Sequence, residues 1–416
     1  MEQKLHTPEG VRDIYNKECE TKLALQRKLS KVLHLYGYQD IQTPTFEYYE
    51  VFRKEIGSTS TQELYKFFDR EGNILALRPD ITPSVARAAA TLFESEDMPI
   101  RLCYAGNTFI NHSSYQGRLK ENTQLGAELI GLDSVEADAE MLAMVADSLK
   151  QIGLQEFQIS LGHVDFIRSL LKAAGLGEEE SREIRALITN RNFFGIEEIL
   201  DAHEVKESVR EAFRLLPELT GGPEVLEQAM SAAPDLDARL AVTRLQQIFR
   251  LLRLYGADAH ITFDLSMIGN YGYYTGIIFR AYTFGTGDAV VRGGRYDHLL
   301  EKFGKDTPSI GFAILLAELM GARGRQKIPV ETIHRNLIVY TEATEEQAVA
   351  LACSFRRKGR NIELVKREPE EEREIYENYA KRTSAAAMLY LRDDQKIEMV
   401  NLRTGDEKLV KIPGVD

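Results

Sequence analysis

Apolar residues recur at helical spacing near the start of the chain and stop at a glycine. The positions that follow this spacing are Leu23, Leu25, Leu29, Val32, Leu33 and Tyr36. A period of about 3.6 residues places such positions on one face of a helix. Gly37, which comes directly after the last of them, suits the left-handed conformation that often ends helices. The segment predicts an amphipathic helix that ends at Gly37.

A run of apolar and aromatic residues follows, reading YQDIQTPTFEYYEVF. Pro44 interrupts this run, and proline within a strand is confined to sheet edges because it has no backbone N–H to donate. We expect an extended segment at a sheet edge or in a contact between subunits. A plain surface strand is the alternative.

The middle of the chain changes from strand patterns to helix patterns. Short strand-like runs alternate with polar turns over residues 102–131, and a helix pattern then runs from Ser134, a suitable N-cap, to Gly153. The segment FQISLGHVDF returns to strand periodicity. Residues from about 178 to 258 are helical in pattern, charged and divided by three prolines. We interpret this stretch as a helical insertion.

Strand periodicity returns in the segments ITFDLSM, YYTGIIFRAYTF and DAVVRGG. The turn Gly285-Thr286-Gly287-Asp288 joins the last two and favours a β-hairpin, so we expect an antiparallel sheet. After Pro329, strands alternate with helices as far as a terminal hairpin. This pattern indicates a small separate α/β domain over residues 331–416.

The composition is that of an ordinary globular protein. The chain has 416 residues, of which 44% are hydrophobic, and this length allows two or three domains. A net charge of −12 argues against a general electrostatic hold on nucleic acid. No stretch is long and apolar enough for a membrane span, and the three cysteines lie too far apart for a disulfide framework or a zinc site. We expect a soluble cytoplasmic protein without a metal or cofactor.

Candidate chemistry lies on the strand around residue 126. Alternate strand residues share a face, so Gln124, Gly126 and Glu128 point one way while the apolar residues between them point the other. Gly126 leaves a gap between an amide and a carboxylate, in which a small polar ligand would fit. A solvated sheet face is the alternative.

Two further segments carry side chains that suit a ligand. LRPDITPSVARA places Asp80 and Thr82 at a turn from strand to helix, where aspartate also serves as a helix cap. Tyr273 and Tyr274 lie among glycines that lack the lysine and the strand-to-helix context of a phosphate-binding loop. These tyrosines are alternatively packing aromatics.

Taken in order, six segments resemble the catalytic core of histidyl-tRNA synthetases over residues 1–325. They are TPEGVRDIY, LRPDITPSVAR, GNTFINHSSYQGRLKENTQLGAELIG, NYGYYTGIIF, GGRYDHLL and TPSIGFAILLAEL. The resemblance implies an α+β class II aminoacyl-tRNA synthetase fold, in which helices flank an antiparallel sheet of six or seven strands. It also implies a dimer formed through the first motif. Residues 331–416 resemble a trimmed anticodon-binding domain.

Three positions depart from the synthetase pattern. In the synthetases, arginines in the second motif, in the histidine-specific signature and in the third motif hold the phosphates of ATP. In this chain those positions are Ile110, Gly269 and Glu318. The departures imply that ATP-dependent activation of an amino acid is lost.

The amino-acid side of the family's pocket is better retained. The family's histidine-contacting positions correspond here to Asp80, Thr82, Gln124, Glu128, Tyr273 and Tyr274. A carboxylate and a tyrosine suit an imidazole. Asp80 stands in place of the synthetases' glutamate and can meet an α-ammonium group from one methylene further back.

A synthetase core without ATP-binding arginines resembles the regulatory subunits of ATP phosphoribosyltransferase, which function in histidine biosynthesis. The resemblance implies no activity of its own, a hetero-octamer with a short-form catalytic subunit, and feedback inhibition by histidine. A divergent histidyl-tRNA synthetase and a non-catalytic tRNA-binding protein are the alternatives. Many regulatory subunits lack a domain like residues 331–416, which carry 15 basic against 17 acidic residues and so have no basic surplus for RNA.

Overall fold

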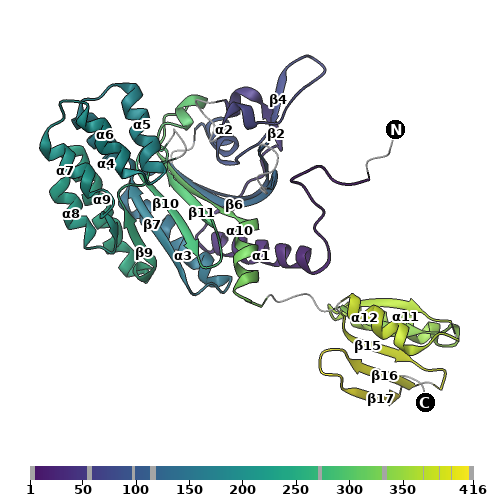
Figure 1. Ribbon diagram of the computed structural model, residues 1–416. Helices are drawn as coiled ribbons and strands as arrows, with labels where there is room; N and C mark the ends of the chain where they lie inside the picture. The colour runs from purple at the N-terminus through teal and green to yellow at the C-terminus, as the bar shows by residue number, and fades with distance from the viewer. Residues whose placement is uncertain are drawn as a thin grey trace. The chain divides into compact units, whose positions relative to one another are not determined.

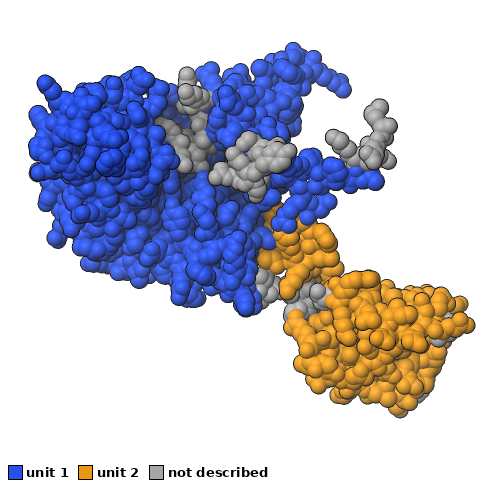
Figure 2. Space-filling view, viewed as in Figure 1, with its two compact units in different colours: residues 1–13, 25–329 blue, residues 14–24, 330–416 orange. Residues whose placement is uncertain are grey.

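The computed structural model describes residues 5–53, 59–95, 99–112, 119–269, 274–329, 335–368, 370–383, 385–394 and 396–411. The chain divides into two compact units, unit 1 with residues 1–13 and 25–329 and unit 2 with residues 14–24 and 330–416 (Figure 2). No helix in the described ranges is long and apolar enough to cross a lipid bilayer.

A mixed sheet forms the centre of unit 1 and, within the described residues, has the strand order β1-β5-β6-β12-β11-β10-β7-β9-β8 (Figure 1). The strands are β1 (Gln39–Asp40), β5 (Ile100–Phe109), β6 (Glu121–Ile130), β12 (Ser309–Leu315), β11 (Val291–Arg295), β10 (Ile277–Thr283), β7 (Phe157–His163), β9 (Ile261–Asp264) and β8 (Thr220–Gly221). Neighbours from β5 to β7 along this order are antiparallel. Strand β1 pairs in parallel with β5, and β9 pairs in parallel with β7 and antiparallel with β8. The sheet confirms the predicted antiparallel centre and extends it at both edges.

Two local predictions in unit 1 are confirmed. Strands β10 and β11 form a hairpin in which Ile278 pairs with Gly294 and Ala281 with Val291. Helix α3 (Val135–Gln151) begins at Ser134, whose hydroxyl accepts a hydrogen bond from the backbone N–H of Ala137 at 3.2 Å. Each element therefore forms where its turn or cap residue favours it.

The run around Pro44 becomes two short edge strands, as its proline indicated. Strand β1 lies at one edge of the main sheet. Strand β2 (Phe46–Tyr48) lies at the edge of a separate three-stranded sheet of order β2-β4-β3, with β3 at Lys66–Phe68 and β4 at Ile74–Leu77. Two aromatic side chains of β2 are exposed.

Helices cover both faces of the main sheet (Figure 1). Alternate residues of β6 show the division, because Leu125 and Leu129 enter the main core with α3, whereas Glu128 contacts the start of α2 on the other face. The helices that border the sheet are α1 (Asn16–Leu35), α2 (Thr82–Leu92), α3 and α10 (Leu316–Arg325). The sheet therefore presents one face to α3 and the opposite face to α2.

A layer of helices lies beside β7 and β9 and shares the main core (Figure 1). It comprises α4 (Val164–Ala174), α5 (Glu178–Thr189), α6 (Phe193–Asp201), α7 (Glu207–Leu215), α8 (Val225–Ala232) and α9 (Leu236–Tyr255). The short 3-10 helices of the chain are Tyr49–Phe52, Thr61–Glu63, Asp258–His260, Leu300–Phe303 and Glu342–Thr344.

The described residues of unit 2 from Arg335 onward form a sheet of order β14-β13-β15-β16-β17 and the helices α11 and α12. The elements are β13 (Arg335–Tyr340), α11 (Glu345–Arg357), β14 (Asn361–Lys366), α12 (Arg373–Arg382), β15 (Ala385–Leu391), β16 (Lys396–Asn401) and β17 (Glu407–Lys411). Ile338 packs in one core cluster with α11, and its neighbour Leu337 packs in another with α12. The helices therefore cover opposite faces of this sheet.

The predicted buried face of α1 was wrong at one residue. Leu25, Leu29 and Leu33 are buried as expected, but Leu23 is 47% exposed. Leu23 and Leu25 are two positions apart, which corresponds to more than half a turn of helix, so the two side chains point in different directions.

Candidate functional site

The turn before α2 brings Asp80 and Thr82 to the sheet. One carboxylate oxygen of Asp80 accepts hydrogen bonds from the backbone N–H groups of Ile81 at 2.8 Å and Thr82 at 3.5 Å. Ile81 is the N-cap residue of α2, and Asp80, one position earlier, holds the turn that leads into the helix. Asp80 also lines a cavity over the sheet, as does Thr82, so this turn positions a carboxylate at the candidate site.

Glu128 lies at the centre of a buried cluster of hydroxyl groups. Thr82 donates a hydrogen bond to its Oε1 at 2.7 Å and Tyr104 donates to the same oxygen at 3.2 Å, while Tyr296 donates to Oε2. The residue is 1% exposed. Burial raises the pKa of Glu128 to about 8, although the three hydroxyl groups oppose that shift. The carboxyl is therefore mostly protonated at neutral pH and offers little negative charge to a ligand.

The predicted gap above Gly126 is filled. A Cβ atom at this position would lie 2.4 Å from the hydroxyl oxygen of Tyr104 and 2.3 Å from the carbonyl oxygen of Phe312. The glycine thus admits the Tyr104 phenol from the neighbouring strand, and that ring occupies the space expected to hold a ligand. The interpretation of Gly126 as a binding gap was wrong.

A small cavity remains beside this cluster, with a volume of about 30 Å³, room for about one or two water molecules. Its polar lining consists of Asp80, Thr82, Gln124, Tyr274, Arg292 and Tyr296. The Oε1 atom of Gln124 is buried and has no hydrogen-bond partner among the described residues. A buried acceptor without a partner costs roughly 1–3 kcal/mol, so a ligand donor at this position would be favourable.

Two arginines on this sheet face were missed in the sequence. Arg280 on β10 and Arg292 on β11 are directly paired across the hairpin, and both line a small adjoining cavity together with Gly269. Arg292 also forms an ion pair with Asp288. Because the two strands were predicted as a hairpin, their alternation could have placed both guanidinium groups on one face.

The remaining predicted residues are dispersed. Gly269 lines the adjoining cavity, Ile110 directly follows β5 and donates its backbone N–H to the carbonyl of Lys120 at 2.9 Å, and Glu318 lies in the first turn of α10. Tyr273 lies outside the described residues. Of the six predicted ligand-contacting residues, the structure brings Asp80, Thr82, Gln124 and Tyr274 together around one cavity and places Glu128 beneath it.

Comparison with known proteins identifies the family of this fold. The family model described as histidyl-tRNA synthetase matches residues 10–319. The chain is 37% identical to the ATP phosphoribosyltransferase regulatory subunit of Acetivibrio thermocellus, over 99% of this chain and 98% of the relative. It is 34% identical to the protein of the same name from Ruminiclostridium cellulolyticum, over 96% and 95% of the two chains.

Solved structures agree with this assignment. A Bacillus halodurans structure described as an ATP phosphoribosyltransferase regulatory subunit/histidyl-tRNA synthetase superposes with a TM-score of 0.83 at 28% identity, covering 93% of this chain and 98% of that one. Histidyl-tRNA synthetase from Nostoc gives a TM-score of 0.82 at 18% identity, covering 98% and 97%, and shows the shared fold alone. The chain therefore belongs to the family of ATP phosphoribosyltransferase regulatory subunits, which has the histidyl-tRNA synthetase fold.

Proposed function

We propose that this chain is a non-catalytic cytoplasmic subunit that assembles with a short-form ATP phosphoribosyltransferase catalytic subunit and makes it sensitive to histidine. The assembly is a hetero-octamer in which two copies of this chain pair through the first motif. The names of its relatives support the partnership, and the missing ATP-binding arginines support the absence of catalysis.

The observation that carries the proposal is the composition of the cavity over the main sheet. Asp80 offers a carboxylate to an α-ammonium group, and Arg292 offers a guanidinium to an α-carboxylate. The partnerless Oε1 of Gln124 can accept a hydrogen bond from an imidazole N–H. The cavity thus has a group for each polar part of histidine, although at about 30 Å³ it must widen to hold the whole ligand.

Glu128 has a supporting role in this proposal. Its carboxyl joins Thr82, Tyr104 and Tyr296, which come from three different segments, and so fixes the floor of the cavity. Tyr296 and Thr82 themselves line the cavity. Glu128 therefore positions ligand-facing hydroxyl groups and does not contact the ligand with a charge.

The divergent-synthetase alternative has one observation in its favour. Arg280 and Arg292 place two positive charges beside Gly269, where the synthetases have a phosphate-binding arginine. Against it, Glu318 places a carboxylate at another of the former arginine positions, where it would repel a triphosphate. We therefore favour an amino-acid sensor over an amino-acid-activating enzyme.

Feedback through such a cavity follows from linkage. Histidine inhibits the complex if it binds the less active conformational state more tightly than the active one. The conformational equilibrium of the catalytic subunit is then shifted by the same free energy. No contact between histidine and the catalytic site is needed.

Replacing Asp80 with asparagine tests the cavity. In Asp80→Asn the amide oxygen can still accept from the backbone N–H groups of Ile81 and Thr82 while the negative charge is removed. We expect the chain to bind histidine by isothermal titration calorimetry, and Asp80→Asn to weaken binding by about tenfold or more, because one charge-assisted contact is lost. Asp201→Asn is the matched control, since Asp201 is exposed and pairs only with Arg210 among its described contacts. Equal affinities in Asp80→Asn and the unmodified chain would exclude this cavity as the histidine site.

A further inference from the structure

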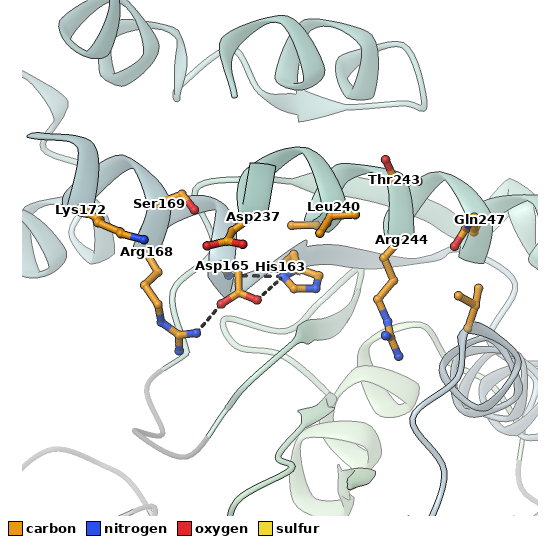
Figure 3. Close-up of a pocket in the computed structure, with 12 residues that line it drawn as sticks. His163, Asp165, Arg168, Ser169, Lys172, Asp237, Leu240, Thr243, Arg244 and Gln247 are labelled. Atoms are coloured by element: carbon orange, nitrogen blue, oxygen red, sulfur yellow. Dashed lines mark hydrogen bonds and ion pairs between the residues drawn. The ribbon is translucent and has the colours of Figure 1, made fainter. Parts of the chain in front are cut away.

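A second pocket lies between α4 and α9 (Figure 3). None of its lining residues lines the cavity over the sheet. The pocket has a volume of about 530 Å³, within the range of about 300–1,000 Å³ typical of small-molecule sites. Helix α4 contributes Asp165, Arg168 and Lys172, which recur at helical spacing and so lie on one face. Helix α9 contributes Asp237 and Arg244 from the other side.

A buried histidine opens onto this pocket. His163, the last residue of β7, is 5% exposed, and its Nδ1 accepts a hydrogen bond from the backbone N–H of Asp165 at 3.3 Å. Burial and nearby arginines lower the pKa of His163 to about 3, so the ring is neutral and its proton lies on Nε2. No described residue accepts a hydrogen bond from Nε2, and this nitrogen lies on the side of the ring away from Asp165 (Figure 3). His163 lines the pocket, so this N–H can meet a hydrogen-bond acceptor there.

The charges around the pocket are only partly paired. Arg168 forms an ion pair with Asp165, and Arg244 donates to Asp138 at 2.6 Å and to Asp133 at 2.8 Å. Within the described part of the chain, Lys172 and Asp237 have no ion pair, and both side chains are exposed. One positive and one negative group are therefore left to meet a ligand.

We propose that this pocket binds a small zwitterion with the charge pattern of a free amino acid. The ligand carboxylate pairs with Lys172 and the ligand ammonium group pairs with Asp237. The His163 Nε2–H points away from Lys172 and is left for a side-chain acceptor of the ligand (Figure 3). A purely anionic ligand would meet the carboxylates of Asp165 and Asp237, and a purely cationic one would meet Arg168, Lys172 and Arg244. Only a ligand that carries both charges matches the lining. This site is separate from the cavity of the proposed function and does not depend on it.

Arg244 is unsuitable as a test position although it lines the pocket. Its guanidinium pairs with Asp138, which is fully buried and also binds Arg295 at 2.6 Å. Removing Arg244 would disturb this buried ion-pair cluster and change folding as well as binding. Lys172 and Asp237 are exposed and have no ion pair within the described residues, so we expect their substitution to change the unfolding temperature only slightly.

The test uses the full chain carrying Asp80→Asn, which weakens the cavity over the sheet, and titrates it calorimetrically with each standard amino acid separately. We expect at least one of them to bind saturably. Adding Lys172→Gln or Asp237→Asn should each weaken that binding by about tenfold or more. Arg182→Gln on α5, an exposed arginine that does not line the pocket, is the control and should leave the affinity unchanged.

A second arm replaces the amino acid that binds by its decarboxylated amine. The amine lacks the carboxylate that Lys172 holds, so we expect its affinity to fall by about tenfold or more. The proposal is overturned if no amino acid binds the Asp80→Asn chain, if binding is unchanged in both pocket variants, or if the amine binds as tightly as the amino acid. Because Asp80→Asn already impairs the cavity over the sheet in this chain, these results are distinct from failure of the proposed function.

Discussion

Purified protein will show no histidine-dependent exchange of pyrophosphate into ATP. Losing one preorganised donor to a developing negative charge costs about 3–4 kcal/mol, so losing three arginines removes on the order of 10 kcal/mol, or about seven decades of rate. Such contributions are not strictly additive, but all three substitutions act in the same direction. Ile110 and Gly269 provide no charge, and Glu318 provides one of the wrong sign.

An active histidyl-tRNA synthetase assayed in parallel is the positive control for this measurement. Exchange within about a thousandfold of the synthetase rate, a difference of only about 4 kcal/mol, would contradict the account. In that case Arg280 and Arg292 would be the candidate phosphate ligands, because they lie beside Gly269. Loss of that exchange in Arg292→Gln would then establish the divergent-synthetase alternative.

The second large effect concerns the folding of unit 1. Asp138 on α3 is fully buried and binds both Arg295 at 2.6 Å and Arg244 at 2.6 Å. Burial raises the pKa of Asp138, and the two arginines oppose that shift. We expect Asp138→Asn to destabilise unit 1 by about 3–5 kcal/mol, because Arg295 is 2% exposed and would be left without its main counter-charge.

Asp133→Asn is the matched control for this variant. Asp133 pairs with Arg244 at 2.8 Å and with Arg295 at 3.7 Å, but its side chain is 57% exposed, so its loss should cost less than about 1 kcal/mol. Differential scanning calorimetry of the full chain can resolve the transition of unit 1 from that of unit 2. Equal destabilisation by the two variants would show that burial of Asp138 is not what makes the cluster important.

Local patterns predicted those parts of the fold that depend on local residues. The β10–β11 hairpin and the start of α3 formed at their turn and cap residues, because neither requires a distant partner. The prediction for Leu23 was wrong because its position departs from the helical spacing of the buried residues and lies on another face of α1. The prediction of a gap above Gly126 was wrong because Tyr104, which fills that space, belongs to a different strand.

The candidate site was predictable only where a family motif covers it. Asp80 and Gln124 could be placed by resemblance, but the raised pKa of Glu128 comes from its burial among segments that are distant from it in sequence. Arg280 and Arg292 stand outside the family's phosphate-binding positions, so comparison of motifs passed over them. The pocket at His163 requires α4 to pack beside α9, which no periodicity in either helix specifies.

The central claim is that the chain is a regulatory subunit, and reconstitution tests it most directly. The purified chain is mixed with the short-form ATP phosphoribosyltransferase catalytic subunit of the same organism, and the mixture is analysed by size-exclusion chromatography and by transferase assay with and without histidine. The account predicts co-elution, transferase activity well above that of the catalytic subunit alone, and inhibition of that activity by histidine. A catalytic subunit that neither co-elutes with this chain nor changes its activity on mixing would contradict the account.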